Sequence, residues 1–284
     1  MGIEDNHYWE DIVKHKLINI KKSVRHSFSI VAGLSTIAGI WGYTVKDINP
    51  LWQCWKWGLV LAVVFIFLSG VFYVIMRSLV HKPYKTSING KPVEIKVGDL
   101  FTENGWKVIP FNDRYDTQVD DVIIAHNSLN GKMIDSYVDN LDALNETIRA
   151  AANDTSELKP KTVGGKTVFP LGRLIAYNDF LMLSFSHFDK QNRAYIGIGE
   201  YEQMLICMWS EMRRVYAAKH IVIPLIGSGI TTIAGMPQKN YTEMLKCILC
   251  TLKGSHFQPE QGISIVLTKE AITNIDMSII KEEF

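Results

Sequence analysis

The sequence predicts a layered α/β domain that follows a two-helix membrane hairpin. Two uncharged segments near the N-terminus, residues 27–45 and 57–76, contain 19 and 20 residues. Each is long enough for a helix to cross a hydrocarbon core of about 30 Å. From residue 93 onward, short apolar runs alternate with helical patterns. That alternation is typical of a mixed or mostly parallel sheet with helices packed on its faces.

The connection between the two apolar segments, residues 46–56, predicts a tight turn. It contains Asn49-Pro50, a dipeptide that favours a turn over a helix. Indole rings prefer the headgroup level of a bilayer, and four tryptophans gather here: Trp41, Trp52, Trp55 and Trp57. No small-residue cleavage site follows the first segment, so residues 27–80 are expected to stay in the mature chain as a hairpin.

The positive charges predict how this hairpin is oriented. Lysines and arginines flank both outer ends of the hairpin, whereas the connection holds only Lys46 and Lys56. Both termini are therefore expected to face the cytoplasm. Residues 1–26 form a basic segment in which Trp9, Val13 and Leu17 recur at helical spacing. An amphipathic helix on the inner leaflet and a plain basic flank are both open.

Composition limits the classes of partner and cofactor. The chain has 30 basic and 29 acidic residues, a balance that gives no support for nucleic acid as a partner. Four scattered cysteines fit reduced thiols, and Cys247 with Cys250 lies in an apolar helical run, which favours core packing over a metal site. No histidine pair has metal-ligand spacing. We expect no cofactor, no metal and no catalytic residue.

The cytoplasmic domain is expected to cover residues 86–284. The predicted strands are 93–97, 106–111, 122–125, 167–170, 180–185, 221–226 and 263–267. The predicted helices are 134–152, 199–218, 241–252 and 269–275. Ligands of such sheets bind at the carboxyl ends of the strands.

One loop at a strand end has the composition of a phosphate cradle. The apolar strand at 221–226 breaks into Gly227, Ser228, Gly229, Ile230 and Thr231. Glycines let backbone amides approach a phosphate, and the hydroxyls of Ser228 and Thr231 add donors. A simple Gly-Ser-Gly turn is the alternative, because short glycine motifs are common.

A second loop begins after Val97 as Gly98-Asp99-Leu100-Phe101. The carboxylate of Asp99 can accept a hydrogen bond from an exocyclic amine, and Phe101 can pack on a base. Alone, Asp99 fits a helix cap equally well.

These two loops, in this order, resemble those of a macro domain, the ADP-ribose-binding module, over roughly residues 90–275. The resemblance implies a three-layer mixed sheet with flanking helices. It places Asp99, Leu100 and Phe101 at the adenine. It places the loop from Gly227 to Thr231 on the diphosphate, and Asn112 near the distal ribose.

The sequence departs from the usual macro-domain pattern after that asparagine. Residues 111–117 and 127–131 replace the usual alanine-asparagine segment and its glycine run. The resemblance therefore implies only a second wall of the site at Ser128, Asn130 and Gly131, and less support for hydrolysis. His187 follows the strand at 180–185 and is a candidate for the same wall, with a surface or core histidine as the alternative.

A membrane hairpin followed by this divergent domain resembles the effector A proteins of type II Thoeris antiphage systems. That resemblance implies a bacterial inner-membrane protein that binds a nucleotide signal, a histidine conjugate of ADP-ribose made by a separate TIR-domain partner. It also implies assembly into homo-oligomers that disrupt the lipid bilayer and abort infection. A membrane-tethered ADP-ribosyl hydrolase and a passive ADP-ribose-binding scaffold are the alternatives.

Overall fold

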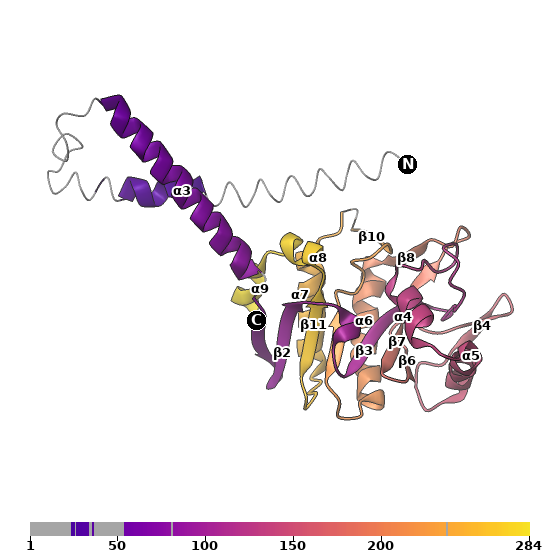
Figure 1. Cartoon of the computed structure of the whole chain (residues 1–284). Coiled ribbons are helices and arrows are strands. Elements are labelled where there is room, and N and C mark those ends of the chain that lie inside the picture. The colour runs from indigo at the N-terminus through magenta and orange to yellow at the C-terminus, as the bar shows by residue number, and fades with distance from the viewer. Residues whose placement is uncertain (1–23, 26, 34–35, 37–53, 81, 237) are drawn as a thin grey trace. The chain divides into compact units, whose positions relative to one another are not determined.

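The computed structural model describes residues 24–25, 27–33, 36, 54–80, 82–236 and 238–284 (Figure 1). The chain divides into two compact units, residues 1–82 and residues 83–284. Helix α3 (Cys54–Val80) belongs to the first unit. The second unit contains a mixed sheet and the helices that flank it.

Helix α3 includes the second uncharged segment, and several of its described large apolar side chains are exposed. The exposed fraction is 65% at Val63, 69% at Ile66 and 68% at Phe67. Of the first uncharged segment, only residues 27–33 and 36 are described, and they are helical. The connection up to residue 53, and the basic segment except residues 24–25, lie outside the described residues. Within the described ranges, no helix meets both the length and the hydropathy that a membrane span requires.

The second unit is built on a nine-stranded sheet. In spatial order its strands are β1 (Tyr84–Ile88), β2 (Lys91–Val97), β11 (Ile263–Leu267), β9 (Ile221–Pro224), β3 (Trp106–Asn112), β7 (Phe180–Phe188), β8 (Ala194–Gly197) and β10 (Thr232–Ala234), with β6 (Leu174–Tyr177) on β7. The strands from β2 to β7 in this order are all parallel. Strand β1 pairs antiparallel with β2, β6 and β8 pair antiparallel with β7, and β10 pairs parallel with β8. The carboxyl ends of the parallel strands therefore share one edge.

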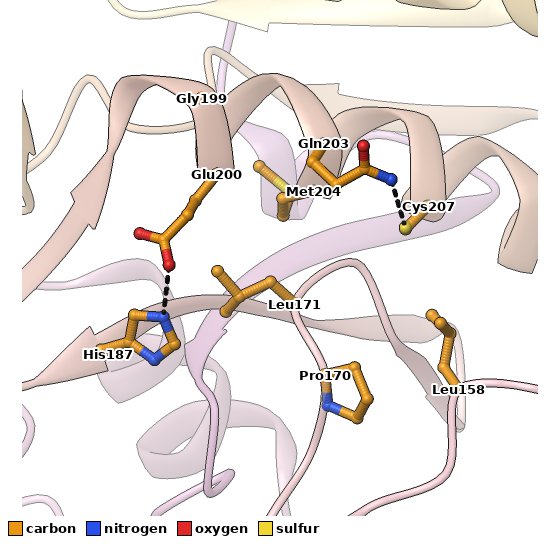
Figure 2. A pocket seen from close by; sticks show the side chains of 9 residues that line it. All are labelled: Leu158, Pro170, Leu171, His187, Gly199, Glu200, Gln203, Met204 and Cys207. Atoms are coloured by element: carbon orange, nitrogen blue, oxygen red, sulfur yellow. Dashed lines mark hydrogen bonds and ion pairs between the residues drawn. The ribbon is translucent and has the colours of Figure 1, made fainter.

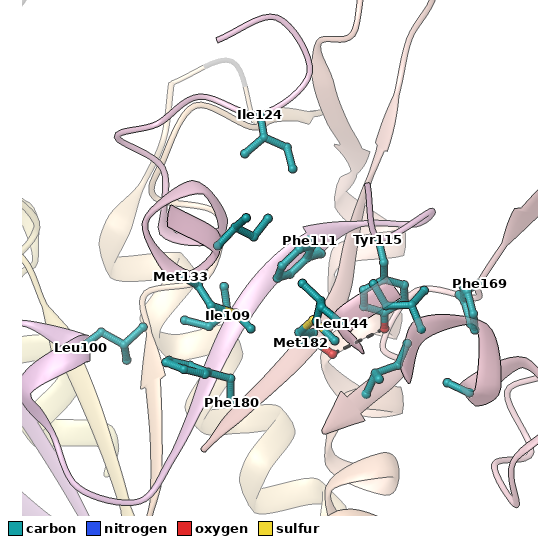
Figure 3. Close-up of a cluster of buried hydrophobic side chains, with 14 of the residues drawn as sticks. Leu100, Ile109, Phe111, Tyr115, Ile124, Met133, Leu144, Phe169, Phe180 and Met182 are labelled. Atoms are coloured by element: carbon teal, nitrogen blue, oxygen red, sulfur yellow. Dashed lines mark hydrogen bonds between the residues drawn. The ribbon is translucent and has the colours of Figure 1, made fainter. Parts of the chain in front are cut away.

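Helices cover both faces of this sheet. On one face, Ile109 and Phe111 of β3 join a buried cluster with Met133 of α4 (Leu129–Tyr137) and Leu144 of α5 (Leu141–Ala150) (Figure 3). Side chains alternate along a strand. On the opposite face, Phe185 of β7 packs edge-on against a tyrosine of α6 (Ile198–Val215), and α6 contacts α7 (Tyr241–Ser255). Both faces of the central strands are buried, as parallel sheets require.

The strand predictions are confirmed for the central strands and wrong at residues 122–125. There the carboxylate of Asp120 accepts the backbone N–H groups of Val122 and Ile123 at 2.9 and 2.7 Å. This side chain holds the backbone in a turn, and only an isolated bridge between Val119 and Ile124 remains. The sequence patterns also missed the short strands β1, β6, β8 and β10 and the hairpin of β4 (Lys161–Val163) with β5 (Lys166–Val168), which replaces the predicted strand at 167–170.

The predicted helix at 134–152 is wrong as a single element. It is two helices, α4 and α5, because Asn140 accepts the N–H of Ala143 at 3.0 Å and caps the second one. The helices predicted at 199–218, 241–252 and 269–275 are observed as α6, α7 and α8 (Lys269–Asn274). The final helix, α9 (Met277–Glu283), was not predicted.

Candidate functional site

The sheet brings most of the predicted site residues to one edge. Asp99 follows β2, whose last residue Val97 pairs with Leu267 of β11. The next strand, β9, leads into the loop at 225–231. Asn112 ends β3, and His187 lies one residue before the end of β7. Because these strands are parallel, all four positions lie at the carboxyl edge, where ligands of α/β sheets bind.

The loop after β9 uses its two glycines differently. Gly227 has a φ of +88°, and an added Cβ would lie 3.0 Å from Met244 and 3.3 Å from Phe185. Gly229 is exposed, and an added Cβ would meet no heavy atom within 4 Å. The fold itself thus requires Gly227. At Gly229 the main chain stays open to the approach of a ligand.

The hydroxyl and apolar side chains of the same loop lie in different surroundings. The N–H of Ser228 donates to the carbonyl of Leu225 at 3.1 Å, which closes the turn. Ile230 is 80% exposed, whereas Thr231 is buried before β10 begins. The simple-turn alternative therefore accounts for Gly227 and Ser228, but it gives no reason for an open glycine beside an exposed isoleucine.

The Asp99 loop is a capped turn of 3-10 helix, η1 (Leu100–Thr102). Asp99 is exposed, and its Oδ1 accepts the N–H of Phe101 at 3.0 Å. Leu100 is buried in the cluster that contains Ile109. The Phe101 ring stacks on Tyr137 at 5.0 Å between centroids and also contacts Phe180, the first residue of β7. Leu100 thus packs into the core, whereas Phe101 is partly buried and packs against the core at the amino end of β7.

Asn112 lies at a bulge, where the register of β3 against β7 shifts after Phe111. It is buried, and its amide is paired within the following turn. Its Nδ2 donates to Asp116 at 2.6 Å, and its Oδ1 accepts the N–H of Asp116 at 2.9 Å. The side chain of Asn112, which was expected to contact the distal ribose, therefore holds the backbone of this turn.

His187 lies between two carboxylates. Its Nδ1 is 2.7 Å from Oδ2 of Asp113 and its Nε2 is 3.4 Å from Oε1 of Glu200. The hydrogen bond to Asp113 raises the pKa of His187, the negative charges of both carboxylates add to this, and burial opposes it. Asp113 is buried, and its Oδ1 has no hydrogen-bond partner among the described residues.

His187 and Glu200 line a cavity of about 410 Å³ (Figure 2). The walls come from the first half of α6 and from the loop before β6, which contributes Pro170 and Leu171. The wall is mostly apolar, with the imidazole and carboxylate at one end, a composition typical of small-molecule pockets. The side chain of His187 is 28% exposed and thus remains accessible from the cavity.

Two strand pairings connect His187 to the glycine loop. His187 pairs with Tyr195 of β8, and Tyr195 pairs with Thr232 of β10, the residue after Thr231. Adjacent strands lie about 5 Å apart, so these positions are separated by about 10 Å. The predicted phosphate loop and His187 therefore belong to one continuous edge.

The predicted second wall forms the N-terminus of α4. Ser128 is the N-cap, and its Oγ accepts the N–H of Gly131 at 3.1 Å and contacts Oδ1 of Asn130 at 2.5 Å. Gly131 is buried, and a Cβ there would lie 2.2 Å from the carbonyl oxygen of Ala125. These contacts lie within one turn. Local structure is therefore sufficient to explain why a serine and a glycine occupy positions 128 and 131.

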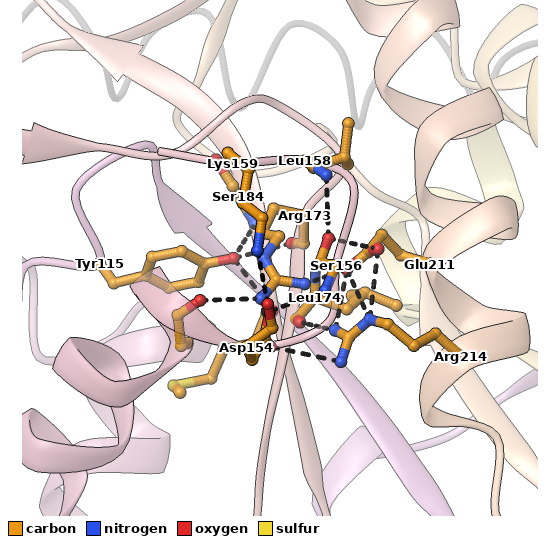
Figure 4. A network of polar contacts seen from close by, with 12 residues as sticks. Tyr115, Asp154, Ser156, Leu158, Lys159, Arg173, Leu174, Ser184, Glu211 and Arg214 are labelled. Atoms are coloured by element: carbon orange, nitrogen blue, oxygen red, sulfur yellow. Dashed lines mark hydrogen bonds and ion pairs between the residues drawn. The ribbon is translucent and has the colours of Figure 1, made fainter. Parts of the chain in front are cut away.

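A buried ionic network holds the framework beneath this edge (Figure 4). Arg173 is fully buried and pairs with Glu211 of α6 and with Asp154. Arg214 also pairs with Glu211, at 2.9 Å. Burial raises the pKa of Glu211, but hydrogen bonds from Arg214, Ser156 and Arg173 outweigh it and hold that pKa below its usual range.

Sequence patterns did not predict Asp113 and Glu200 as the partners of His187, or Arg173 as a buried structural charge. The role of Asp113 could have been predicted from its position, because it directly follows Asn112 at a strand end. The roles of Glu200 and Arg173 could not, since their partners are distant in the sequence.

The cysteines show a mixed outcome. Cys247 is half-buried, and burial raises the pKa of its thiol to about 11. Cys250 of α7 is exposed, so the prediction of core packing is wrong there. Among the described residues, no group of three histidine, cysteine or acidic side chains is placed to hold a metal ion.

Comparison with known families gives a match over most of the second unit. The family described as "Thoeris protein ThsA, Macro domain" matches residues 93–268. Thoeris protein ThsA from Bacillus amyloliquefaciens (strain Y2) is 35% identical over 236 residues, which cover 79% of this chain and 79% of that protein.

Solved structures to which this chain is similar include macrodomains from Oceanobacillus iheyensis. The macrodomain with ADP is 15% identical, with a TM-score of 0.46, and the match covers 71% of this chain and 96% of that one. The macrodomain with MES bound is 14% identical, with a TM-score of 0.45, and the match covers 72% of this chain and 99% of that one.

Proposed function

Because this chain belongs to the family of Thoeris ThsA proteins with a macro domain, we propose that residues 83–284 bind an ADP-ribose-derived signal. The observation that carries the proposal is the loop after β9. Gly229 is exposed there, with no heavy atom within 4 Å of an added Cβ, although nothing in the packing requires a glycine. An open main chain at the carboxyl edge of a parallel sheet fits a diphosphate.

The proposed ligand runs along the carboxyl edge. Its adenine lies near Asp99, which is exposed, while Leu100 and Phe101 support this loop from the core. Its diphosphate lies on the loop from Gly227 to Thr231. The distal part lies toward Asn112 and His187, with Ser128, Asn130 and Gly131 as a second wall. The pairing of His187 with Tyr195, and of Tyr195 with Thr232, supports one continuous site.

The proposed signal is a histidine conjugate of ADP-ribose that a TIR-domain protein makes during phage infection. This identity rests on the resemblance to type II Thoeris effectors. The 410 Å³ cavity beside His187 supports it, because the cavity gives room for a group beyond the distal ribose. In this role the chain is a receptor and not an enzyme.

The proposed output is disruption of the bacterial inner membrane by a hairpin formed by residues 27–45 and 57–76, with both termini in the cytoplasm. Two uncharged segments of 19 and 20 residues, flanked by basic residues, support this proposal. The exposed apolar side chains of α3, among them Val63, Ile66 and Phe67, support it as well. A hairpin without charged side chains is expected to act only in many copies.

The proposed coupling between binding and output is a population shift. The ligand must bind an assembled state better than the monomer, by about 5 kcal/mol for a switch from nearly all monomer to nearly all oligomer. Chemical crosslinking of the full-length chain is expected to give larger species only with ligand. An unchanged size distribution would contradict this step.

Calorimetric titration of the purified full-length chain tests the binding step. We expect ADP-ribose and its histidine conjugate to bind, and Gly229→Glu to abolish binding by filling and charging the open main-chain surface. Gly254→Glu is the matched control, because Gly254 also has no atom within 4 Å of an added Cβ and lies near the end of α7. If neither ADP-ribose nor its histidine conjugate binds to the wild-type chain, the proposal is refuted.

A membrane-tethered ADP-ribosyl hydrolase is the second candidate. One observation favours it: the imidazole of His187 is held between Asp113 and Glu200 beside a cavity, a geometry suited to proton transfer. Release of ADP-ribose from a modified protein, lost in Asn112→Ala and in His187→Asn, would support this candidate over a pure receptor.

A further inference from the structure

Arg114 is a half-buried arginine whose charge has no partner in the described part of the chain. Its Nε is fully buried without a hydrogen-bond partner, and no described residue pairs with the rest of its guanidinium. Arginine remains cationic at any ordinary pH and presents five donors in a fixed plane. A buried N–H of a charged group that has no acceptor costs free energy. An anion bound at this position would remove that cost.

Neither of the acidic side chains nearest in sequence to Arg114 pairs with it. Asp113 binds His187 at 2.7 Å through Oδ2, while its Oδ1 has no hydrogen-bond partner among the described residues, and Asp116 binds Asn112 at 2.6 Å. Arg173, which is fully buried, has Glu211 and Asp154 as ion partners. Arg114 is therefore not neutralised by its own loop, although two carboxylates lie within two residues of it.

The backbone around Arg114 is fixed on both sides. The N–H of Asp113 donates to the carbonyl of Ser186 at 2.8 Å, and the carbonyl of Asp113 accepts the N–H of Phe169 at 2.7 Å. The hydroxyl of Tyr115 donates to the carbonyl of Arg173 at 2.7 Å. The backbone that carries Arg114 is therefore ordered without a ligand, so binding an anion costs no entropy for ordering this turn.

Arg114 also lies in the segment where this sequence leaves the usual macro-domain pattern, two residues beyond the end of β3. The diphosphate already has a proposed cradle on the loop after β9, two strand pairings away from His187. The segment at 111–117 is instead next to the position proposed for the distal end of the ligand. A planar guanidinium matches the two oxygens of a carboxylate.

We propose that Arg114 binds a carboxylate carried by the ligand beyond its distal ribose and thereby selects the signal over ADP-ribose itself. This inference rests on the proposed function of the domain. It assigns the discrimination between signals to one residue.

Calorimetric titration with three related ligands tests this assignment on the full-length chain. The ligands are ADP-ribose, its histidine conjugate and its histamine conjugate, which lacks only the carboxylate. We expect the wild type to bind the histidine conjugate roughly tenfold to a hundredfold more tightly than the histamine conjugate. Arg114→Gln is expected to remove that difference while the affinity for ADP-ribose stays unchanged.

Two further variants separate recognition from folding. Arg114→Lys keeps the charge but loses the planar fork, so we expect it to retain part of the discrimination. Arg149→Gln, at an exposed arginine of α5, is the matched control and should behave as wild type. All variants are first compared by thermal unfolding. If Arg114→Gln melts far below wild type, the titrations are carried out with Arg114→Lys instead, and its discrimination between the two conjugates decides the test.

The possible failures are distinguishable. If the wild type binds ADP-ribose but does not discriminate between the two conjugates, or if Arg114→Gln still discriminates, the role of Arg114 is refuted and the proposed function stands. Equal weakening of all three ligands in Arg114→Gln also refutes it, since Arg114 would then bind the diphosphate. If the wild type binds none of the ligands, the proposed function fails, and this inference fails with it.

Discussion

Nδ1 of His187 lies 2.7 Å from Oδ2 of Asp113, and this contact ties the carboxyl end of β7 to the turn that follows β3. Asp113 is buried, and its backbone is also bonded to β7 through Ser186. The pair therefore fixes the relative position of two strand ends that both lie at the candidate site. Its strength depends on the protonation of the imidazole.

The stabilising effect of His187 is expected to fall as pH rises. Its pKa is raised in the folded chain by Asp113 and then by Glu200, so the folded state binds the proton more tightly than the unfolded state. The contribution is complete below the unfolded value of about 6.5 and disappears as pH rises through the higher folded pKa. Urea unfolding of wild type and His187→Asn across this range should show a stability gap that shrinks with increasing pH. A gap that is constant with pH would contradict this assignment.

Removal of the buried arginine beneath the site is expected to destabilise the domain strongly. Arg173→Met leaves Glu211 largely buried with one cationic partner fewer, and such losses cost about 3–5 kcal/mol. Arg193→Met is the matched control, because Arg193 is 76% exposed in its ion pair with Asp189, and exposed pairs contribute about 0–1 kcal/mol. Equal unfolding free energies for the two variants in urea would show that the network has little structural role.

The two glycines of the loop after β9 are expected to respond differently to alanine. Gly227→Ala places a Cβ 3.0 Å from Met244 at a φ of +88°, and we expect a loss of about 1–3 kcal/mol in unfolding free energy. Gly229→Ala meets no neighbour, so its stability should stay within about 0.5 kcal/mol of wild type. Chemical denaturation measures both. A large destabilisation by Gly229→Ala would mean that this glycine serves the fold.

The proposed membrane hairpin predicts that charges placed on α3 release the chain from membranes. Val63 and Phe67 are 65% and 68% exposed and lie four residues apart on this helix. Val63→Asp combined with Phe67→Asp should move the chain from the carbonate-washed membrane pellet to the supernatant, because a carboxylate at the centre of a bilayer costs about 2.5–3.5 kcal/mol. Ile279→Asp, on α9 of the other unit, is the control and should not change the fractionation. Recovery of the double variant in the pellet would argue against the hairpin.

Sequence patterns located the central strands because these are buried on both faces and read as apolar runs. Ile263–Leu267 is buried at every position, and its bounds were predicted without error. Short strands such as β8 and β10 escaped prediction, since three or four residues that are mostly not buried carry no periodic signal. The false strand at 122–125 shows the same limit, because the apolar run was overruled by the carboxylate of Asp120.

The sequence by itself determined which strand ends carry polar and glycine residues, and therefore where the loops of Asp99, Gly227 and Asn112 lie. Chemistry between distant residues was decided only by the tertiary structure. His187 meets Asp113 across 74 positions and Arg173 meets Glu211 across 38, through strand register and helix packing that no local pattern encodes. Arg114 is a similar case: two carboxylates lie within two residues of it in the sequence, and only the folded turn shows that they contact His187 and Asn112 and do not pair with Arg114.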